Sequence, residues 1–283
     1  MLGRSILAGG ISMGYYVKVE PGVKNYVEDI NPTGSKTILF LHGWPGSHKL
    51  FEYQFDQLPR LGYRCIGIDT RGFGNSDKPW GGYDYDRLAD DVRCVIEALE
   101  LEDITLGGHS TGGAIAVRYM ARHRAHGVSK LALFAAAAPS LIQRPYFPHG
   151  LPKEAVTDII KGTLDDRPKM LRGFGEMFFF RHITEPFSDW FFQLGLEAAG
   201  WATAAIANTW LGEEKLFSDL EKIQVPTLIL HGIHDQVCRF PLAEAQQKAV
   251  KNSRLVPFKY SGHGLFYDQR EEFNKELIRF IEE

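Results

Sequence analysis

The segment at residues 107–113, which reads GGHSTGG, constrains the fold of this chain more than any other feature. It begins at the last residue of the apolar run ITLG (residues 104–107), and a helical pattern begins directly after it. A strand that turns this sharply into a helix leaves little room for side chains, and glycine meets that demand. The pattern therefore predicts a tight strand–turn–helix unit with Ser110 at its apex, where the helix N-terminus aims backbone N–H groups.

Short apolar runs alternate with helical patterns along the rest of the chain. The runs lie at residues 37–41, 64–69, 104–107, 130–134, 227–230 and 253–258, and the helical patterns at 85–99, 114–122, 242–250 and 270–281. Two further strand patterns, at residues 15–20 and 24–30, flank the turn Pro21-Gly22. Runs of this kind are typical of strands that are buried on both faces of a parallel sheet. We therefore predict an α/β fold with a mostly parallel central sheet flanked by helices.

Residues 140–215 break this alternation, because they contain no clear strand pattern and are rich in phenylalanine and tryptophan. One interpretation is a helical subdomain with its own apolar core. A second, compatible interpretation is a helical cap whose aromatic side chains also line an apolar pocket. We predict a helical cap inserted after the sixth strand, with Phe147, Phe179 and Trp190 in a substrate pocket.

The remaining residues divide around this insertion. Residues 13–139 and 216–283 are expected to form the α/β core. Residues 1–12 precede a second methionine, Met13, and contain no convincing signal-peptide cleavage site. We interpret them as a disordered or vector-derived leader.

Composition limits the partners that the protein can bind. The formal net charge is −3 and no long run of lysine or arginine occurs, so nucleic acid and anionic membranes have no electrostatic basis as partners. No stretch approaches 18 uninterrupted apolar residues, which excludes a membrane span. The three cysteines, Cys65, Cys94 and Cys238, form no CxxC motif and favour reduced thiols in a cytoplasmic protein. The oligomeric state stays open.

Ser110 fits a G-x-S-x-G pattern, and its context favours a nucleophile over a glycine-rich turn without chemistry. A serine hydroxyl needs a base to accept its proton. His263 lies in the flexible loop SGHG after the last strand, and Asp235 lies in HGIHD after the strand pattern TLIL. We predict that Asp235 orients His263 and that His263 activates Ser110. Asp69 also ends a strand, but it precedes the serine, so we interpret it as a turn residue.

A developing oxyanion would need preorganised donors. We predict that one is the backbone N–H of Thr111, the residue after the nucleophile. The other is expected in the loop HGWPG after residues 37–41, where Trp44 has an N–H and Pro45 has none.

The segment HGIHD contains side chains that bind metals in other proteins. His231, His234 and Asp235 could act as ligands, but no second cluster completes the set of about four that zinc prefers. We therefore expect neither a metal nor another cofactor.

Four motifs occur in a recognisable order: HGWPG, DTRGFGNSDKP, GHSTGG, and the pair HGIHD and SGHG. From about residue 15 to its end the chain resembles the serine α/β-hydrolase superfamily, in particular the cofactor-free haloperoxidase and aryl-esterase branch. Some motifs are also similar to epoxide hydrolases, in which the nucleophile is an aspartate, usually followed by tryptophan. Ser110 and Thr111 occupy those positions here. The serine favours the esterase and haloperoxidase branch. Thr111 departs from the pattern of that branch, which usually has methionine after the serine.

This resemblance implies a carboxylic-ester hydrolase that acts on small to medium apolar esters through a Ser-His-Asp acyl-enzyme mechanism. The proline after the expected oxyanion residue, Pro45, resembles the pattern of the perhydrolase-competent members. This resemblance implies a secondary activity with hydrogen peroxide. A lactonase and a hydrolase of C–C bonds remain enzymatic alternatives, because they use the same triad. A ligand receptor with slow turnover is the alternative from another class of protein.

Overall fold

The centre of the fold is an eight-stranded sheet, seen in a computed structural model that describes residues 13–283. Its strands are β1 (Met13–Glu20), β2 (Val23–Ile30), β3 (Thr37–Leu41), β4 (Arg64–Ile68), β5 (Ile104–His109), β6 (Val128–Phe134), β7 (Thr227–Gly232) and β8 (Ser253–Phe258). They lie in the order β1-β2-β4-β3-β5-β6-β7-β8. β1 pairs with β2 and β2 with β4 in antiparallel fashion, and every pairing from β4 to β8 is parallel. The predicted α/β fold is confirmed. The predicted leader at residues 1–12 lies outside the described residues.

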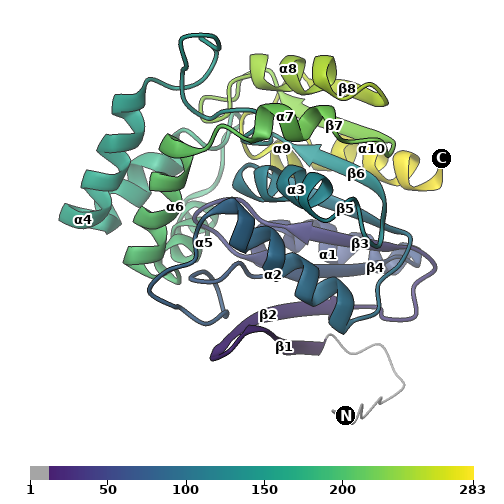
Figure 1. The fold of residues 1–283 in the computed structure, drawn as a ribbon. Coiled ribbons are helices and arrows are strands. Elements are labelled where there is room, and N and C mark those ends of the chain that lie inside the picture. Colours follow the sequence, from purple (N-terminus) through teal and green to yellow (C-terminus); the bar gives the residue numbers. More distant parts are fainter. Residues whose placement is uncertain (1–12) are drawn as a thin grey trace.

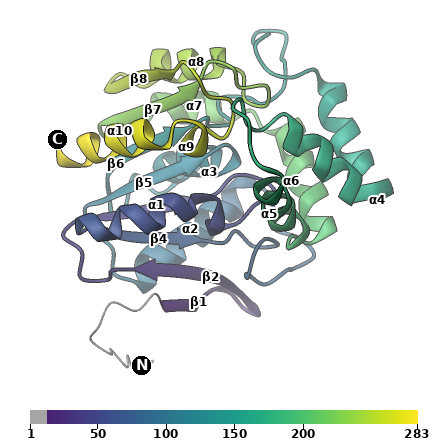
Figure 2. The ribbon, with the colours of Figure 1, turned by 180° about the vertical axis from the view of Figure 1, so that it is seen from behind.

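Helices cover both faces of the sheet. One face, toward the viewer in Figure 1, carries α2 (Tyr85–Ala98), α3 (Thr111–Arg122), α7 (Leu216–Glu221) and α8 (Pro241–Ala249). The opposite face, toward the viewer in Figure 2, carries α1 (Glu52–Gln57), α9 (Leu265–Asp268) and α10 (Arg270–Glu282). Two short 3-10 segments, η1 (His48–Phe51) and η2 (Pro59–Leu61), flank α1. Within residues 13–283, we find no helix with the length and apolar character that a bilayer crossing demands.

The main core lies between the sheet and these helical layers. Every residue of β5 and β7 is buried, because helices cover the sheet on both sides. Phe134, the last residue of β6, is fully buried and meets the ring of Phe273 in α10 edge-on, with 4.8 Å between ring centroids. Its ring also lies 6.5 Å from that of Phe40 in β3. Phe134 thus links β6, and through Phe40 also β3 on the far side of β5, to one helical layer.

Three helices between β6 and β7 form a separate group beyond one end of the sheet: α4 (Lys153–Glu176), α5 (Glu185–Leu196) and α6 (Gly200–Gly212). Trp44, which follows β3, contacts both Phe174 of α4 and a carbonyl of α6. The group therefore covers the carboxyl ends of the parallel strands, where ligands bind in open α/β sheets. We call α4, α5 and α6 the cap helices. The exact division at residues 140–215 stays a prediction.

Removing the Phe134 side chain should leave a cavity at the centre of the core. We expect Phe134→Ala to lower the free energy of unfolding by about 3–5 kcal/mol. Urea unfolding followed by circular dichroism at 25 °C measures this. Leu164→Ala, at a cap-helix position that is 72 % exposed, is the control and should change stability by about 0.5 kcal/mol or less. Equal losses in the two variants would contradict this description of the core.

Candidate active site

Ser110 lies at a sharp turn between the end of β5 and the start of α3. Its backbone adopts φ 53° and ψ −119°, a region that non-glycine residues rarely occupy. Gly112 fits here because a Cβ at this position would collide with the carbonyl oxygen of Leu41 at the end of β3. At Gly108 a Cβ would approach the carbonyl oxygen of Gly112 to 2.5 Å. The close approach of these segments holds Ser110 at the carboxyl end of the sheet.

His263 and Asp235 are joined by a direct hydrogen bond on the loops after β8 and β7. Nδ1 of His263 donates to Oδ2 of Asp235 over 2.8 Å, and both side chains are completely buried. Oδ1 of Asp235 accepts the backbone N–H groups of Val237 and Cys238 at 2.8 and 2.9 Å. Burial alone would raise the pKa of Asp235, but His263 and His231 outweigh it and hold the pKa below its usual range. The carboxylate is therefore ionised and fixes the ring of His263.

The other nitrogen of His263, Nε2, is available for proton transfer. Nε2 is buried and has no hydrogen-bond partner among residues 13–283. His109, the neighbour of Ser110 in the chain, donates from Nε2 to the carbonyl oxygen of His263 over 2.9 Å, and the two rings lie 4.6 Å apart. The hydroxyl of Ser110 instead lies 3.8 Å from Sγ of Cys238, and within the described chain no hydrogen bond joins it to His263. The structure thus brings the three predicted residues into one cluster without the final serine–histidine contact.

Two fully buried histidines surround this cluster in the neutral form. Burial, together with the nearby His263, lowers the pKa of His109 well below its usual value of 6.5. Burial also lowers the pKa of His42. His42 accepts the N–H of Thr70 at Nε2 and donates from Nδ1 to the carbonyl oxygen of Gly43. His42 therefore anchors the loop that follows β3.

The two predicted oxyanion donors lie on segments that border Ser110. Thr111 is the first residue of α3, so its N–H is among the helix donors without an acceptor inside the helix. Trp44 follows Gly43, and a Cβ at Gly43 would lie 3.1 Å from Cβ of Ser110. Both side chains are buried, at 3 % exposure each. The placement suits two backbone donors, and the role itself stays a prediction.

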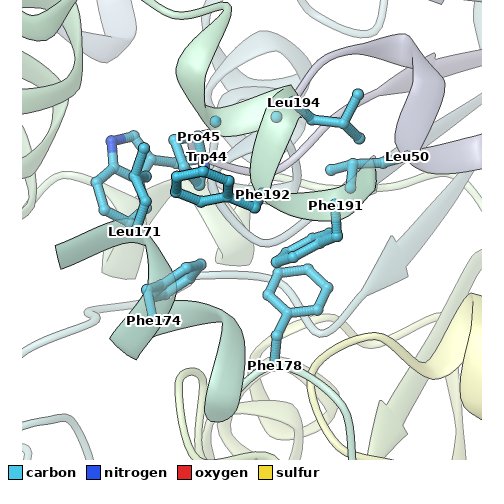
Figure 3. Close-up of a pocket in the computed structure, with 11 residues that line it drawn as sticks. Trp44, Pro45, Leu50, Leu171, Phe174, Phe178, Phe191, Phe192 and Leu194 are labelled. Atoms are coloured by element: carbon cyan, nitrogen blue, oxygen red, sulfur yellow. The ribbon is translucent and has the colours of Figure 1, made fainter. Parts of the chain in front are cut away.

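A small apolar cavity lies between the loop after β3 and the cap helices (Figure 3). Its volume is about 10 Å³, close to the space that one water molecule needs. The lining consists of Trp44, Pro45, Gly46, Leu50, Leu171, Phe174, Phe178, Phe191, Phe192, Leu194 and Gly195. Phe178 also meets the ring of His263 edge-on, with 4.9 Å between centroids. The cavity therefore adjoins the candidate base through one aromatic ring.

The three predicted pocket residues do not line this cavity. Phe147 packs edge-on against Phe217, Phe179 packs against Tyr267, and Trp190 packs against Phe187. A substrate role for Phe147, Phe179 and Trp190 stays a prediction. Sequence reasoning missed Phe174, Phe178, Phe191 and Phe192 as cavity residues, although all four lie in the aromatic segment that it singled out. Only the packing of α4 and α5 decides which rings face inward.

Asp69 lies in the turn after β4, and its carboxylate bonds His48 and Asn75 rather than His263. Its Oδ1 accepts both the backbone N–H and the Nδ1 of His48, and its Oδ2 accepts the N–H of Asn75. These bonds match the interpretation of Asp69 as a turn residue. In the part of the chain that the structure describes, no group of three or more histidine, cysteine, aspartate or glutamate side chains could hold a metal ion.

Comparison with known proteins identifies the family. Residues 36–269 match the alpha/beta hydrolase fold family, and the chain belongs to that family. It is 47 % identical to the AB hydrolase superfamily protein YisY of Bacillus subtilis, over 95 % of this chain and 99 % of that protein. It is 32 % identical to the bifunctional esterase/perhydrolase DCH of Acinetobacter calcoaceticus, over 94 % of this chain and 99 % of that protein.

A solved structure agrees with these sequence relatives. The esterase EaEST from Exiguobacterium antarcticum superposes with a TM-score of 0.93 at 44 % identity, covering 96 % of this chain and all of that one. Other relatives, 31 % identical, are named non-heme chloroperoxidase and haloperoxidase, which confirms the resemblance to that branch. The protein is an esterase-type enzyme of the alpha/beta hydrolase fold.

The buried neutral histidines make stability depend on pH. The pKa values of His109 and His42 are lower in the folded state than in the unfolded chain. Below about pH 6.5 the unfolded chain therefore binds more protons than the folded protein, and the free energy of unfolding falls as the pH falls. We expect the free energy of unfolding to fall by up to about 1.4 kcal/mol per pH unit for each such group. Urea unfolding at pH 7.5, 6.0 and 5.0 measures the slope. His109→Gln keeps a donor for the His263 carbonyl and should reduce the slope; an unchanged slope would contradict this account.

Proposed function

We propose that the protein hydrolyses carboxylic esters of small to medium apolar substrates through an acyl-enzyme intermediate on Ser110. The observation that carries the proposal is the buried His263–Asp235 pair, because Nε2 of His263 has no hydrogen-bond partner among residues 13–283 and its ring lies 4.6 Å from that of His109, the neighbour of Ser110. An imidazole oriented by a carboxylate, with one nitrogen left for proton transfer, is suited to general base catalysis. The esterase names of the relatives support the same reaction class.

The proposed reaction begins with rotation of the Ser110 hydroxyl away from Cys238 toward Nε2 of His263. His263 accepts the hydroxyl proton while Oγ attacks the ester carbonyl carbon. The backbone N–H groups of Trp44 and Thr111 stabilise the oxyanion. His263 then donates its proton to the departing alkoxide, and the alcohol leaves. In the second half, His263 takes a proton from water while the water oxygen attacks the acyl carbonyl. His263 then returns that proton to the departing Oγ of Ser110, which releases the carboxylic acid and restores the serine.

The apolar cavity supports a small apolar acyl group. Its walls are aromatic and aliphatic, and it begins at Trp44, one of the proposed oxyanion residues. At about 10 Å³ it holds little more than a methyl-sized group unless the cap helices or the lining rings move. Larger acyl groups therefore require displacement of α4 or α5.

A second activity, perhydrolysis, is favoured by Pro45 in the cavity wall and by the name of one relative, a bifunctional esterase/perhydrolase. In this reaction hydrogen peroxide replaces water, attacks the acyl-enzyme and leaves as a peroxyacid, while its proton passes through His263 to Ser110. The proposal also includes a cytoplasmic location, which the free thiols of Cys65, Cys94 and Cys238 support.

Removal of the nucleophile should abolish turnover without loss of the fold. We expect Ser110→Ala to lower kcat for p-nitrophenyl acetate by at least about 10⁴-fold, because no acyl-enzyme can form. Asp235→Asn should also lower kcat strongly, by about 10³–10⁴-fold, because His263 loses its orienting carboxylate. Steady-state kinetics and thermal unfolding of each variant test this. Ser110→Ala with more than one hundredth of wild-type turnover would overturn the proposal.

The wild-type enzyme also separates the proposal from its alternatives. Many turnovers per second support an enzyme, whereas a single stoichiometric burst of p-nitrophenol supports a ligand receptor. A panel of esters with increasing acyl length, together with lactones and a vinylogous diketone, separates ester hydrolysis from lactonase and C–C hydrolase activity. We expect the highest kcat/KM for short acyl esters, and a preference for either of the other classes would contradict this assignment.

Perhydrolysis has its own test. We expect peracetic acid to form from acetate and hydrogen peroxide with the wild-type enzyme and not with Ser110→Ala, because both reactions use the same acyl-enzyme. The monochlorodimedone bromination assay measures the peroxyacid. Absence of peracetic acid under conditions in which ester cleavage is fast would overturn the proposed perhydrolysis.

A further inference from the structure

One cap helix contacts both proposed oxyanion residues. Trp210 of α6 is buried and donates from its indole Nε1 to Oγ1 of Thr111 over 3.1 Å. Its ring meets that of Trp44 edge-on, with 5.0 Å between centroids. Trp44 in turn donates from Nε1 to the carbonyl oxygen of Thr203 over 3.0 Å. Thr203 lies about two turns before Trp210 on the same helix. The side chains of Trp44 and Thr111 are therefore fixed to each other through α6.

The surroundings of these contacts exclude water. Trp44, Thr111 and Thr203 are almost completely buried, and Trp210 is 6 % exposed. Tyr85, which is fully buried, interacts with the side chains of both Thr111 and Trp210. A buried donor or acceptor that loses its partner is not rescued by solvent. The position of the Thr111 hydroxyl, and with it the first turn of α3, depends on this polar cluster.

We propose that Trp210 is a positioning residue that sets the geometry of the oxyanion hole through the Thr111 hydroxyl and the Trp44 ring. The inference rests on the proposed function, because it takes the backbone N–H groups of Trp44 and Thr111 as the oxyanion donors. Donors that act on a developing charge must be held in place before the reaction, and small displacements reduce the rate. The packing of α6 against the core then also positions the two oxyanion donors.

The test is the substitution Trp210→Phe, which keeps an aromatic ring and removes the N–H donor. We expect kcat for p-nitrophenyl acetate to fall about tenfold. Affinity for 1,1,1-trifluoro-2-butanone, whose adduct with serine places an oxyanion in the hole, should fall by about the same factor. Trp201→Phe is the matched control: it lies on the same helix and also loses an indole donor, but its partner is the carbonyl oxygen of Pro79 at the surface. Both measurements should stay within about twofold of wild type there.

Substitutions at Thr111 test the same bond from its acceptor side. Thr111→Val keeps the shape and removes the acceptor, so its effect should equal that of Trp210→Phe, and the double variant should be no worse than either single one. Thr111→Ser keeps the hydroxyl, so its kcat should exceed that of Thr111→Val by at least about threefold. If Trp210→Phe does not fold, the comparison of kcat between Thr111→Val and Thr111→Ser tests the role of the hydrogen bond by itself.

Two results would overturn the inference. One is wild-type kcat and ketone affinity in Trp210→Phe or in Thr111→Val, and the other is multiplication of their separate effects in the double variant. These failures are distinct from failure of the proposed function. If Ser110→Ala abolishes turnover while Trp210→Phe does not change it, the serine mechanism stands and only the role of Trp210 is wrong.

Discussion

The rest of the site depends on the contact between two glycine-containing turns at the carboxyl ends of β3 and β5. Gly112 approaches the carbonyl oxygen of Leu41, and Gly43 approaches His109 and Ser110, at distances that leave no space for a Cβ atom. A non-glycine residue with positive φ costs about 1–2 kcal/mol, and here Ser110 is held in that conformation by strands packed on both sides. The same contact brings the segment of Gly43 and Trp44 close to that of Ser110 and Thr111. One contact therefore underlies both the conformation of Ser110 and the placement of the two residues that carry the proposed oxyanion donors.

A second constraint is the charge of Asp235 in a fully buried place. An unpaired carboxylate there would be strongly destabilising. Two backbone N–H groups and the ring of His263 satisfy it. The contacts that stabilise this charge also fix the orientation of His263, with Nδ1 bonded to the acid and Nε2 left without a partner among residues 13–283. The same contacts therefore stabilise the ionised carboxylate of Asp235 and orient His263 as a base.

Much of the core follows from sequence periodicity, because parallel strands covered on both faces must be short and apolar. The runs at residues 37–41 and 253–258 coincide with β3 and β8, and most other predicted boundaries differ by one to three residues. The short helices α1, α7 and α9 were missed, since four to six residues are too few for a periodic pattern. The relation of Ser110, Asp235 and His263 could be expected from strand ends and chain order. The cavity rings and the contact of Trp210 with Thr111 could not, because they depend on how α4, α5 and α6 pack against the core.

The central claim is that Ser110 is the acyl acceptor, and trapping the acyl group on the chain tests it most directly. The enzyme would be mixed with p-nitrophenyl acetate, quenched in acid within milliseconds, digested and mapped by tandem mass spectrometry. We predict one added acetyl group, on Ser110. An acetyl group that accumulates and turns over on another residue, such as Cys238, would contradict it.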